Sequence, residues 1–267
     1  MINTNITIGQ YIPGESVIHR ADPRTKIVLS LVFMIVIFTI NSFWTFTAMT
    51  LFTLVSVIIS GVPMKYTLRG LKPLLFIIIF TAVINIFTTS GTPISQTVPL
   101  KYITYEGISL ALKLAVRLAL IIISGSLLTF TTTPILLTDG IEKLLSPFKK
   151  IGLPAHELAM MMSIALRFIP TLLEETDKIM KAQAARGADF DTGNLIQRAK
   201  SFVPVLVPLF VSAFRRADEL ATAMEARCYR GGTGRTRMRQ LEFTKADTMI
   251  IAAAGLFFTG LLLLEFL

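Results

Sequence analysis

The sequence predicts an all-α membrane protein with about five transmembrane helices and a cytoplasmic module of long, crossed helices. Of its 267 residues, 53% are hydrophobic and 16% are charged, and the mean hydropathy is +0.67. Soluble domains average about 25% charged residues, so a soluble core could not hide this apolar excess. Crossing the hydrocarbon of a bilayer takes about 20 residues. The apolar runs that we interpret as spans are residues 27–40, 43–60, 74–89, 108–130 and 248–264.

The first two runs form a predicted hairpin. One helix through both runs would overshoot the bilayer, so we expect two spans that turn at Asn41 and Ser42. Asp22 suits an N-cap and Pro23 suits the first helical position, which starts the first span. Both ends of the hairpin are basic and its turn is uncharged, so the positive-inside rule places both ends in the cytoplasm. The basic residues are Arg20, Arg24 and Lys26 at one end and Lys65, Arg69 and Lys72 at the other.

The next two spans lead out of the cytoplasm and back. The third leads to residues 90–105, which hold Lys101 as their single basic residue, as expected of an outer loop. The fourth carries Lys113 and Arg117 four residues apart on one face. These side chains either snorkel to the outer interface or face inward and hold neighbouring helices, or a partner, through hydrogen bonds to carbonyls. The sequence leaves both interpretations open.

Most of the positive charge lies after the fourth span. Residues 131–245 hold 17 of the 26 Lys and Arg residues, against 12 acidic ones, and contain no long apolar run free of charge. We therefore predict transmembrane helices 1–4 in residues 1–130, a cytoplasmic module in residues 131–245 and a C-terminal transmembrane helix in residues 246–267. This topology puts the N-terminus in the cytoplasm and the C-terminus outside.

Two long helices are predicted in the cytoplasmic module. The first covers residues 156–185, with a broad apolar stripe and Pro170 as a kink. The second covers residues 195–229 and bends or splits at Pro204 and Pro208. Small side chains recur along it at every fourth position, a pattern that lets two helix backbones cross closely. These helix-crossing candidates are Ala213, Ala217 and Ala221.

Both helices end in an arginine that follows alanine. Gly187 is a favoured residue after a helix end and leaves Arg186 in the last turn, and Arg227 occupies a similar setting shortly before Gly231. Such arginines are either solvated helix ends that complement the helix dipole or contacts for two receptor grooves. Periodicity alone leaves both interpretations open. The two tips are Ala185-Arg186-Gly187 and Ala226-Arg227-Cys228.

The sequence predicts neither a catalytic site nor a metal site. It lacks the G-x-x-x-x-G-K-[ST] pattern that cradles nucleotide phosphates, and one Cys with two His is too few for a zinc or iron–sulfur site. An intramembrane protease would need acids and histidines inside the bilayer, whereas Glu174-Glu175 lies in the module and neither His lies in a span. Residues 230–239 are basic without interleaved aromatics, so positive-inside topology explains them better than binding of nucleic acid or anionic lipid.

Several long segments resemble one family. They are LLTFTTTP (127–134), ALRFIPTLLEE (165–175), KAQAARGADF (181–190), VPLFVSAFRRADELATAMEARCYRGG (207–232) and GRTR (234–237). These segments are similar to the transmembrane (T) component of energy-coupling factor transporters, the membrane scaffold of bacterial importers for vitamins and metal ions. The resemblance implies that two Ala-Arg-Gly-type motifs, at the ends of coupling helices, insert into grooves on two ATPase subunits. Here the second motif has Cys228 where the family has glycine, which leaves its helix ending open.

The resemblance implies a non-catalytic coupling subunit in the bacterial plasma membrane. Its expected partners are two ABC ATPases, of the energy-coupling factor A and A′ type, a substrate-binding S component and the lipid bilayer, with no nucleic acid. We expect no cofactor on this chain, because ATP and Mg²⁺ would bind to the ATPases. The alternative is a conventional ABC permease that lines the pathway itself, against which the scarcity of ionisable groups in the spans argues.

The predicted topology can be tested by cysteine labelling. After Cys228→Ser, a reporter introduced as Ser95→Cys should react with a membrane-impermeant thiol reagent added outside intact cells, because residue 95 lies in the outer loop. A reporter introduced as Ser201→Cys should react only after the membrane is opened. The opposite labelling pattern would show that the topology is inverted.

Overall fold

A computed structural model describes residues 11–92, 103–190, 192, 194–231 and 241–266 of the chain. The regular secondary structure of these residues is helical. The chain divides into two compact units. Within the described residues, the membrane unit contains residues 11–92, 103–141 and 241–266, and the α8–α9 unit contains residues 142–190, 192 and 194–231. Ser95, Lys101 and the GRTR segment at 234–237 lie outside the described residues.

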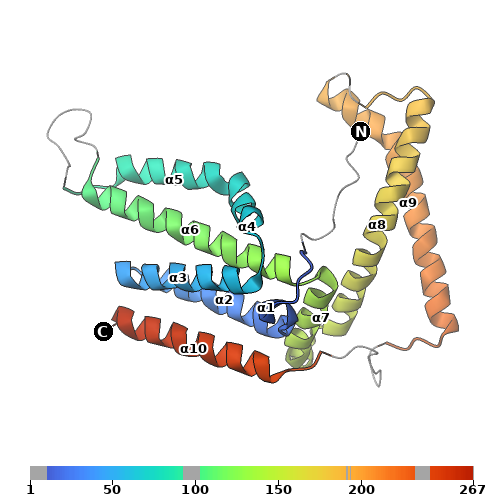
Figure 1. Cartoon of the computed structure of the whole chain (residues 1–267). Coiled ribbons are helices and arrows are strands. Elements are labelled where there is room, and N and C mark those ends of the chain that lie inside the picture. The colour runs from blue at the N-terminus through green and yellow to red at the C-terminus, as the bar shows by residue number, and fades with distance from the viewer. Residues whose placement is uncertain (1–10, 93–102, 191, 193, 232–240, 267) are drawn as a thin grey trace. The chain divides into compact units, whose positions relative to one another are not determined.

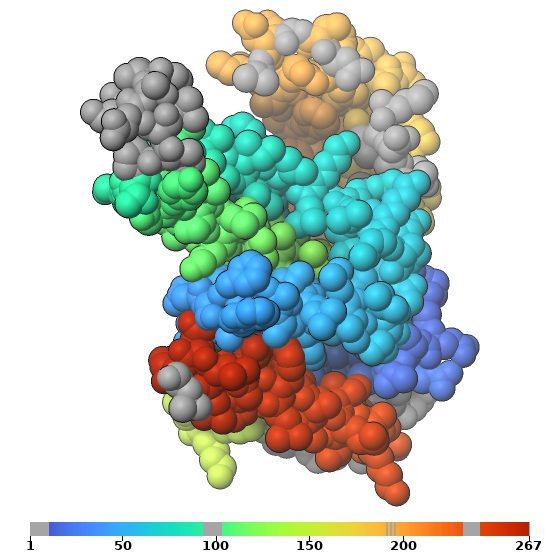
Figure 2. Space-filling view, turned by 60° about the vertical axis from the view of Figure 1, so that its left-hand side comes forward, coloured from blue at the N-terminus to red at the C-terminus, as the bar shows by residue number. Residues whose placement is uncertain are grey.

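In the membrane unit, helices α2 to α5 contact α6, and α10 packs against α2 and α3. Helices α2, α3, α6 and α10 run side by side, and α5 lies along α6 on the side away from α3 (Figure 1). In Figure 2, α10 (red) lies against α3 (blue), and α4 to α6 (cyan to green) lie on the other side of α3. The elements are α1 (Val17–Arg20), α2 (Pro23–Thr39), α3 (Phe43–Ser60), α4 (Met64–Leu71), the short 3₁₀ helix η1 (Lys72–Leu74), α5 (Leu75–Thr88), α6 (Tyr105–Thr131) and α10 (Lys245–Phe266).

The predicted hairpin begins and turns as expected. The Asp22 side chain accepts a hydrogen bond from the Arg24 backbone N–H at 2.8 Å, and Pro23 is the first residue of α2. This arrangement is the expected N-cap followed by proline, which has no N–H to leave unpaired. Helix α3 covers the same residues as the second predicted span. The prediction of a helical hairpin with its turn at Asn41 and Ser42 is therefore confirmed.

Five helices among the described residues are long and apolar enough to cross a membrane: α3, the stretch Met64–Thr88 that joins α4 to α5, α6, α8 and α10. The number agrees with the prediction, but one member differs. The first predicted span forms α2, whose 17 residues are at the short end for a span. Helix α8, which we expected in the cytoplasmic module, also qualifies and is the least apolar of the five. The third span starts earlier than predicted, because an amphipathic helix, α4, leads into it.

The core of the membrane unit lies between α2, α3, α6 and α10. Phe33 and Ile37 of α2, Met49 of α3 and Phe258 of α10 are buried there, and Leu120 of α6 completes the contact. By contrast, none of the residues of α5 is buried. Helix α5 therefore turns most of its apolar side chains outward, as expected for a helix surrounded by lipid.

A polar cluster joins three helices where the α2–α3 hairpin turns. The Glu265 carboxylate, in the last turn of α10, accepts hydrogen bonds from the backbone N–H groups of Asn41 (2.9 Å) and Ser42 (3.2 Å) and from the Thr45 hydroxyl (2.8 Å). Arg117 of α6 donates to the Ile40 carbonyl at 2.7 Å. The side chain of Arg117 thus holds a neighbouring helix through a carbonyl, which was the second of the two interpretations left open by the sequence.

The α8–α9 unit consists mainly of two long helices, α8 (Ala155–Ala185) and α9 (Leu195–Ala226). Helix α7 (Pro134–Leu145) contains the boundary between the two units, and the 3₁₀ helix η3 (Ser146–Ile151) follows it. Both long helices were predicted. Helix α9 passes through Pro204 and Pro208 without a break and changes direction along its length (Figure 1).

Replacing Glu265 should weaken the membrane unit. In Glu265→Ala, the N–H groups at the start of α3 lose their acceptor, and loss of such a cap costs about 1 kcal/mol. The midpoint of thermal unfolding in detergent, followed by circular dichroism, should fall by about 2–4 °C. Glu265→Gln keeps one carbonyl acceptor and should lose less. An unchanged midpoint in Glu265→Ala would show that the cluster adds nothing to stability.

Candidate functional site

Helices α8 and α9 run antiparallel, held by polar contacts along their length. Residues that ascend along α8 contact residues that descend along α9, so the end of α8 lies near the start of α9. The contacts are Tyr229 hydroxyl to Met160 Sδ (3.1 Å), Arg216 to Glu175 (2.9 Å) and Gln183 Nε2 to the Pro204 carbonyl (3.4 Å). The helix ends that carry the two arginine motifs therefore lie at opposite ends of the pair, separated by about 35 Å of helix.

The contact at Pro204 follows from the proline pair in α9. Pro208 has no N–H, so the carbonyl of Pro204 lacks its normal partner in the helix. Gln183, three residues before Arg186, donates to this free carbonyl. The bend in α9 thus provides an acceptor that fastens the tip of α8.

The first tip is a Schellman motif. Helix α8 ends at Ala185, and Gly187 adopts φ +90°, a left-handed conformation that glycine reaches without a steric penalty. The N–H of Gly187 donates to the Ala184 carbonyl at 3.0 Å, and the N–H of Ala188 donates to the Gln183 carbonyl at 3.0 Å. Two carbonyls at the helix end are therefore satisfied, which leaves Arg186 at the cap position.

The second tip has the same geometry, although it lacks the glycine. Cys228 follows Arg227 and adopts φ +57°, and among the described residues other than glycine it is the one with positive φ. Its N–H donates to the Glu225 carbonyl at 2.8 Å, and the N–H of Tyr229 donates to the Met224 carbonyl at 3.0 Å. The helix ending that the sequence left open is therefore again a Schellman motif.

The two tip arginines lie at opposite ends of the α8–α9 pair. Arg186 and Arg227 are exposed, and neither guanidinium forms a hydrogen bond or an ion pair within the part of the chain that the structure describes. A guanidinium offers five donors in a planar fork, which matches a carboxylate or a set of carbonyls. Each tip is thus a free donor group on a fixed helix end.

The alanine ridge lies beside the contact between α8 and α9. Ala213 is half-buried, whereas Ala217 and Ala221 are exposed. The polar contacts of the pair instead come from Ser212 and Arg216, which both bond to Glu175 of α8. The close helix crossing at this ridge stays a prediction. Most of the ridge is exposed, so within the described residues it is not covered by another helix of the chain.

Sequence reasoning missed the residues that support the tips. Gln183, Tyr229 and the Glu175–Arg216 pair are brought together by the fold, and no spacing in the sequence marks them as partners. No group of three or more His, Cys, Asp or Glu side chains that could hold a metal ion occurs among the described residues.

Comparisons with known proteins agree on one family. The family model described as CbiQ, cobalt transport protein, matches residues 14–238. Many curated relatives carry the name energy-coupling factor transporter transmembrane protein EcfT, and three of them illustrate the similarity. The relative from Ruminiclostridium cellulolyticum is 62% identical over 262 residues, which cover 98% of each chain. The one from Bacillus subtilis is 49% identical over 259 residues, 95% of this chain and 98% of the relative.

The third relative is from Lactococcus lactis and is 45% identical over 249 residues, 93% of this chain and 94% of the relative. The relatives are thus similar over nearly the whole length of this chain, which includes the two long helices and their arginine tips. The chain therefore belongs to the CbiQ/EcfT family and is a multi-pass transmembrane component of an energy-coupling factor transporter.

Proposed function

We propose that this subunit carries ATP-driven motion from two ABC ATPases to a substrate-binding S component that imports a vitamin or a metal ion. Arg186 and Arg227 are the docking contacts, one for each ATPase. The subunit itself catalyses no reaction and binds no cofactor, since ATP and Mg²⁺ occupy the ATPases. It lies in the bacterial plasma membrane with the α8–α9 unit and the N-terminus in the cytoplasm and the C-terminus outside.

The observation that carries this proposal is the matched geometry of the two tips. Each presents an exposed, unpaired arginine at the cap of a Schellman motif, in spite of the different residues that follow. The tips lie at opposite ends of one helix pair, so they suit two separate grooves rather than one. If the two arginines were ordinary solvated helix ends, the same arrangement of arginine and Schellman motif would not be required at both tips.

The contacts between α8 and α9 explain how docking could produce force. Glu175 accepts hydrogen bonds from Ser212 and Arg216 near the middle of the pair, and Gln183 fastens the α8 tip to the bend in α9. Movement of one tip therefore reorients the other helix instead of bending a free end. Two ATPases that close on nucleotide would move both tips at once.

The apolar lining of a cavity in the membrane unit favours a coupling subunit over a permease that lines the transport pathway itself. One cavity of the membrane unit, of about 460 Å³, is lined mainly by apolar side chains such as Phe33, Phe52 and Phe258, with Lys26 and several serine and threonine hydroxyls among them. A metal ion on its way through the membrane needs oxygen, nitrogen or sulfur ligands, and the surface of this cavity is mainly apolar. The substrate site therefore belongs to the S component in this proposal.

Replacing the two tip arginines should detach the ATPases. Loss of one arginine that pairs with a buried charge at an interface costs about 2–5 kcal/mol. Each of Arg186→Ala and Arg227→Ala should reduce the amount of ATPase that co-purifies with the tagged subunit, and the double variant should nearly abolish it. Lysine at either position should restore only part of the association, because it keeps the charge and loses the planar fork.

Arg215 provides the matched control, because it is exposed on the side of α9 and away from both tips. Arg215→Ala should retain the ATPases. Quantitative mass spectrometry of the purified complexes makes the comparison. Parental amounts of both ATPases in the double alanine variant would reject the tips as docking contacts.

Glycine at position 228 should stabilise the second tip. A residue with a side chain pays about 1 kcal/mol for the left-handed conformation that Cys228 adopts, and glycine does not. Cys228→Gly should therefore raise the midpoint of thermal unfolding and keep the ATPases bound. Cys228→Val should lower it, since a β-branched side chain fits positive φ poorly. A lower midpoint in Cys228→Gly would contradict the observed geometry.

A further inference from the structure

The chain passes between its two units at two places. It leaves the membrane unit within α7, after residue 141, and re-enters it at residue 241. Thr131 and Thr132 precede α7, and the segment from Leu241 to Asp247 leads into α10. Both connecting segments bond to the same five residues, 22–26, at the start of α2. This convergence is a property of the membrane unit alone.

Lys26 holds the connection that leaves the membrane unit. Its ammonium group donates to the Thr131 carbonyl (3.0 Å), the Thr132 hydroxyl (3.0 Å) and the His19 carbonyl (3.1 Å). All three donors of the lysine are thereby used, and Thr131 and Thr132 are both buried. The half-buried Lys26 ammonium group, with its three hydrogen bonds, fixes the end of α6 against the start of α2.

Helix α7 lies close against the same segment. A β-carbon added at Gly140 would lie 3.0 Å from the Cβ of Pro23 and 3.5 Å from the backbone nitrogen of Arg24. The absence of a side chain at Gly140 thus lets the two backbones approach. The chain that continues from α7 into the other unit therefore starts from a helix packed directly on the start of α2.

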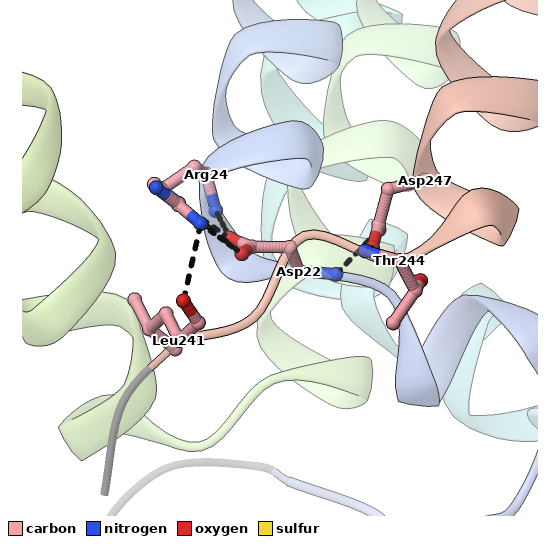
Figure 3. Close-up of polar contacts among 5 residues, drawn as sticks. All are labelled: Asp22, Arg24, Leu241, Thr244 and Asp247. Atoms are coloured by element: carbon pink, nitrogen blue, oxygen red, sulfur yellow. Dashed lines mark hydrogen bonds and ion pairs between the residues drawn. The ribbon is translucent and has the colours of Figure 1, made fainter.

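The segment that returns to the membrane unit and leads into α10 is held by Asp22, Arg24 and Asp247 (Figure 3). The Asp247 carboxylate, fully buried, accepts from the backbone N–H of Asp22 at 2.7 Å and from the N–H and hydroxyl of Thr244 at 2.9 and 2.6 Å. Arg24 pairs with Asp22 at 2.7 Å and reaches the Leu241 carbonyl at 3.5 Å. The start of α10 is thus tied to the start of α2.

Capping of α2 alone does not account for this network. The cap needs only the bond between Asp22 and the N–H of Arg24. Lys26 and Arg24 instead reach segments 105 and 217 residues away in sequence. One of those segments leads into α7, within which the chain passes to the other unit, and the other leads into α10 after the chain returns.

We propose that residues 22–26 form the joint through which motion of the α8–α9 unit enters the membrane helices. Lys26 and Arg24, together with Asp247, act as positioning residues that make both connections move as one body with α2. Without these bonds, each connection would flex locally and absorb the displacement. This inference rests on the proposed function, since it assumes that the ATPases move the α8–α9 unit.

The test separates motion from assembly in the full complex. After Cys228→Ser, spin labels are placed at Leu31→Cys on α2 and Phe80→Cys on α5, both exposed positions. The tagged complex with its ATPases is reconstituted in lipid nanodiscs, and pulsed electron paramagnetic resonance measures the distance between labels without nucleotide and after trapping with ADP-vanadate. ATP hydrolysis and ATPase content are measured on the same samples.

Lys26→Met removes the three donors and keeps the length of the side chain. We expect the nucleotide-dependent change in distance to fall at least twofold, while ATPase content and the rate of ATP hydrolysis stay within about twofold of the parent. Lys26→Arg should restore most of the change. If Lys26→Met yields no intact complex, Arg24→Met takes its place, because its side chain is partly exposed and its bond to Leu241 is longer.

Arg117→Met is the matched control, since it also removes a cation that donates to a carbonyl, but at the hairpin turn of α2 and α3. It should keep the parental change in distance. If the distance between the labels changes as much in Lys26→Met as in the parent, the proposed joint is wrong and the proposed function is unaffected. The same holds for Arg24→Met where that variant carries the test. An equal loss in Arg117→Met would also overturn it, because general loosening would then explain the effect. If nucleotide does not change the distance between the labels in the parent complex, although the ATPases are bound, both the proposed function and the proposed joint are wrong.

Discussion

The membrane unit depends on satisfying the backbone groups at its helix ends in a medium with little water. An N–H group without an acceptor is costly in such surroundings. Helix α10 supplies acceptors at both of its ends. Asp247, in its first turn, accepts from Asp22, and Glu265, in its last turn, accepts from Asn41 and Ser42. Helix α2 is therefore fastened to α10 at both of its ends, which sets the register of the apolar core between the two helices.

Local features of the fold could be predicted from the sequence, because neighbouring residues determine them. The α2 cap at Asp22 and Pro23 and the full extent of α3 follow from residue types and hydropathy. The prediction was less accurate where a helix changes character along its length. Lys65 and Arg69 suggested a boundary, yet they lie in an amphipathic helix that continues into the third span. Helix α8 was predicted to lie in the cytoplasmic module, whereas its length and composition also suit a span.

Contacts between distant segments could not be predicted in the same way. Asp22 and Asp247 are 225 residues apart, and Glu175 and Arg216 are 41 apart, so neither pair leaves a periodic signal. The arginine tips were located from the helix-ending residues and from the family resemblance. That Cys228 would adopt the conformation of a glycine could not be inferred, since backbone bonds at the helix end impose it against the usual preference of the residue.

Four basic side chains fall into two environments, and this contrast suggests that one pair stabilises the membrane unit and the other pair binds partners. Lys26 and Arg117 donate to carbonyls of neighbouring helices, so their charges hold the membrane unit together. Arg186 and Arg227 are exposed and have no such partner among the described residues. Removing water from a guanidinium is costly unless a groove provides matching acceptors, so each exposed tip favours a specific partner over a general apolar surface. Because α8 and α9 are tied to each other between these tips, a partner that binds at either end acts on the whole pair.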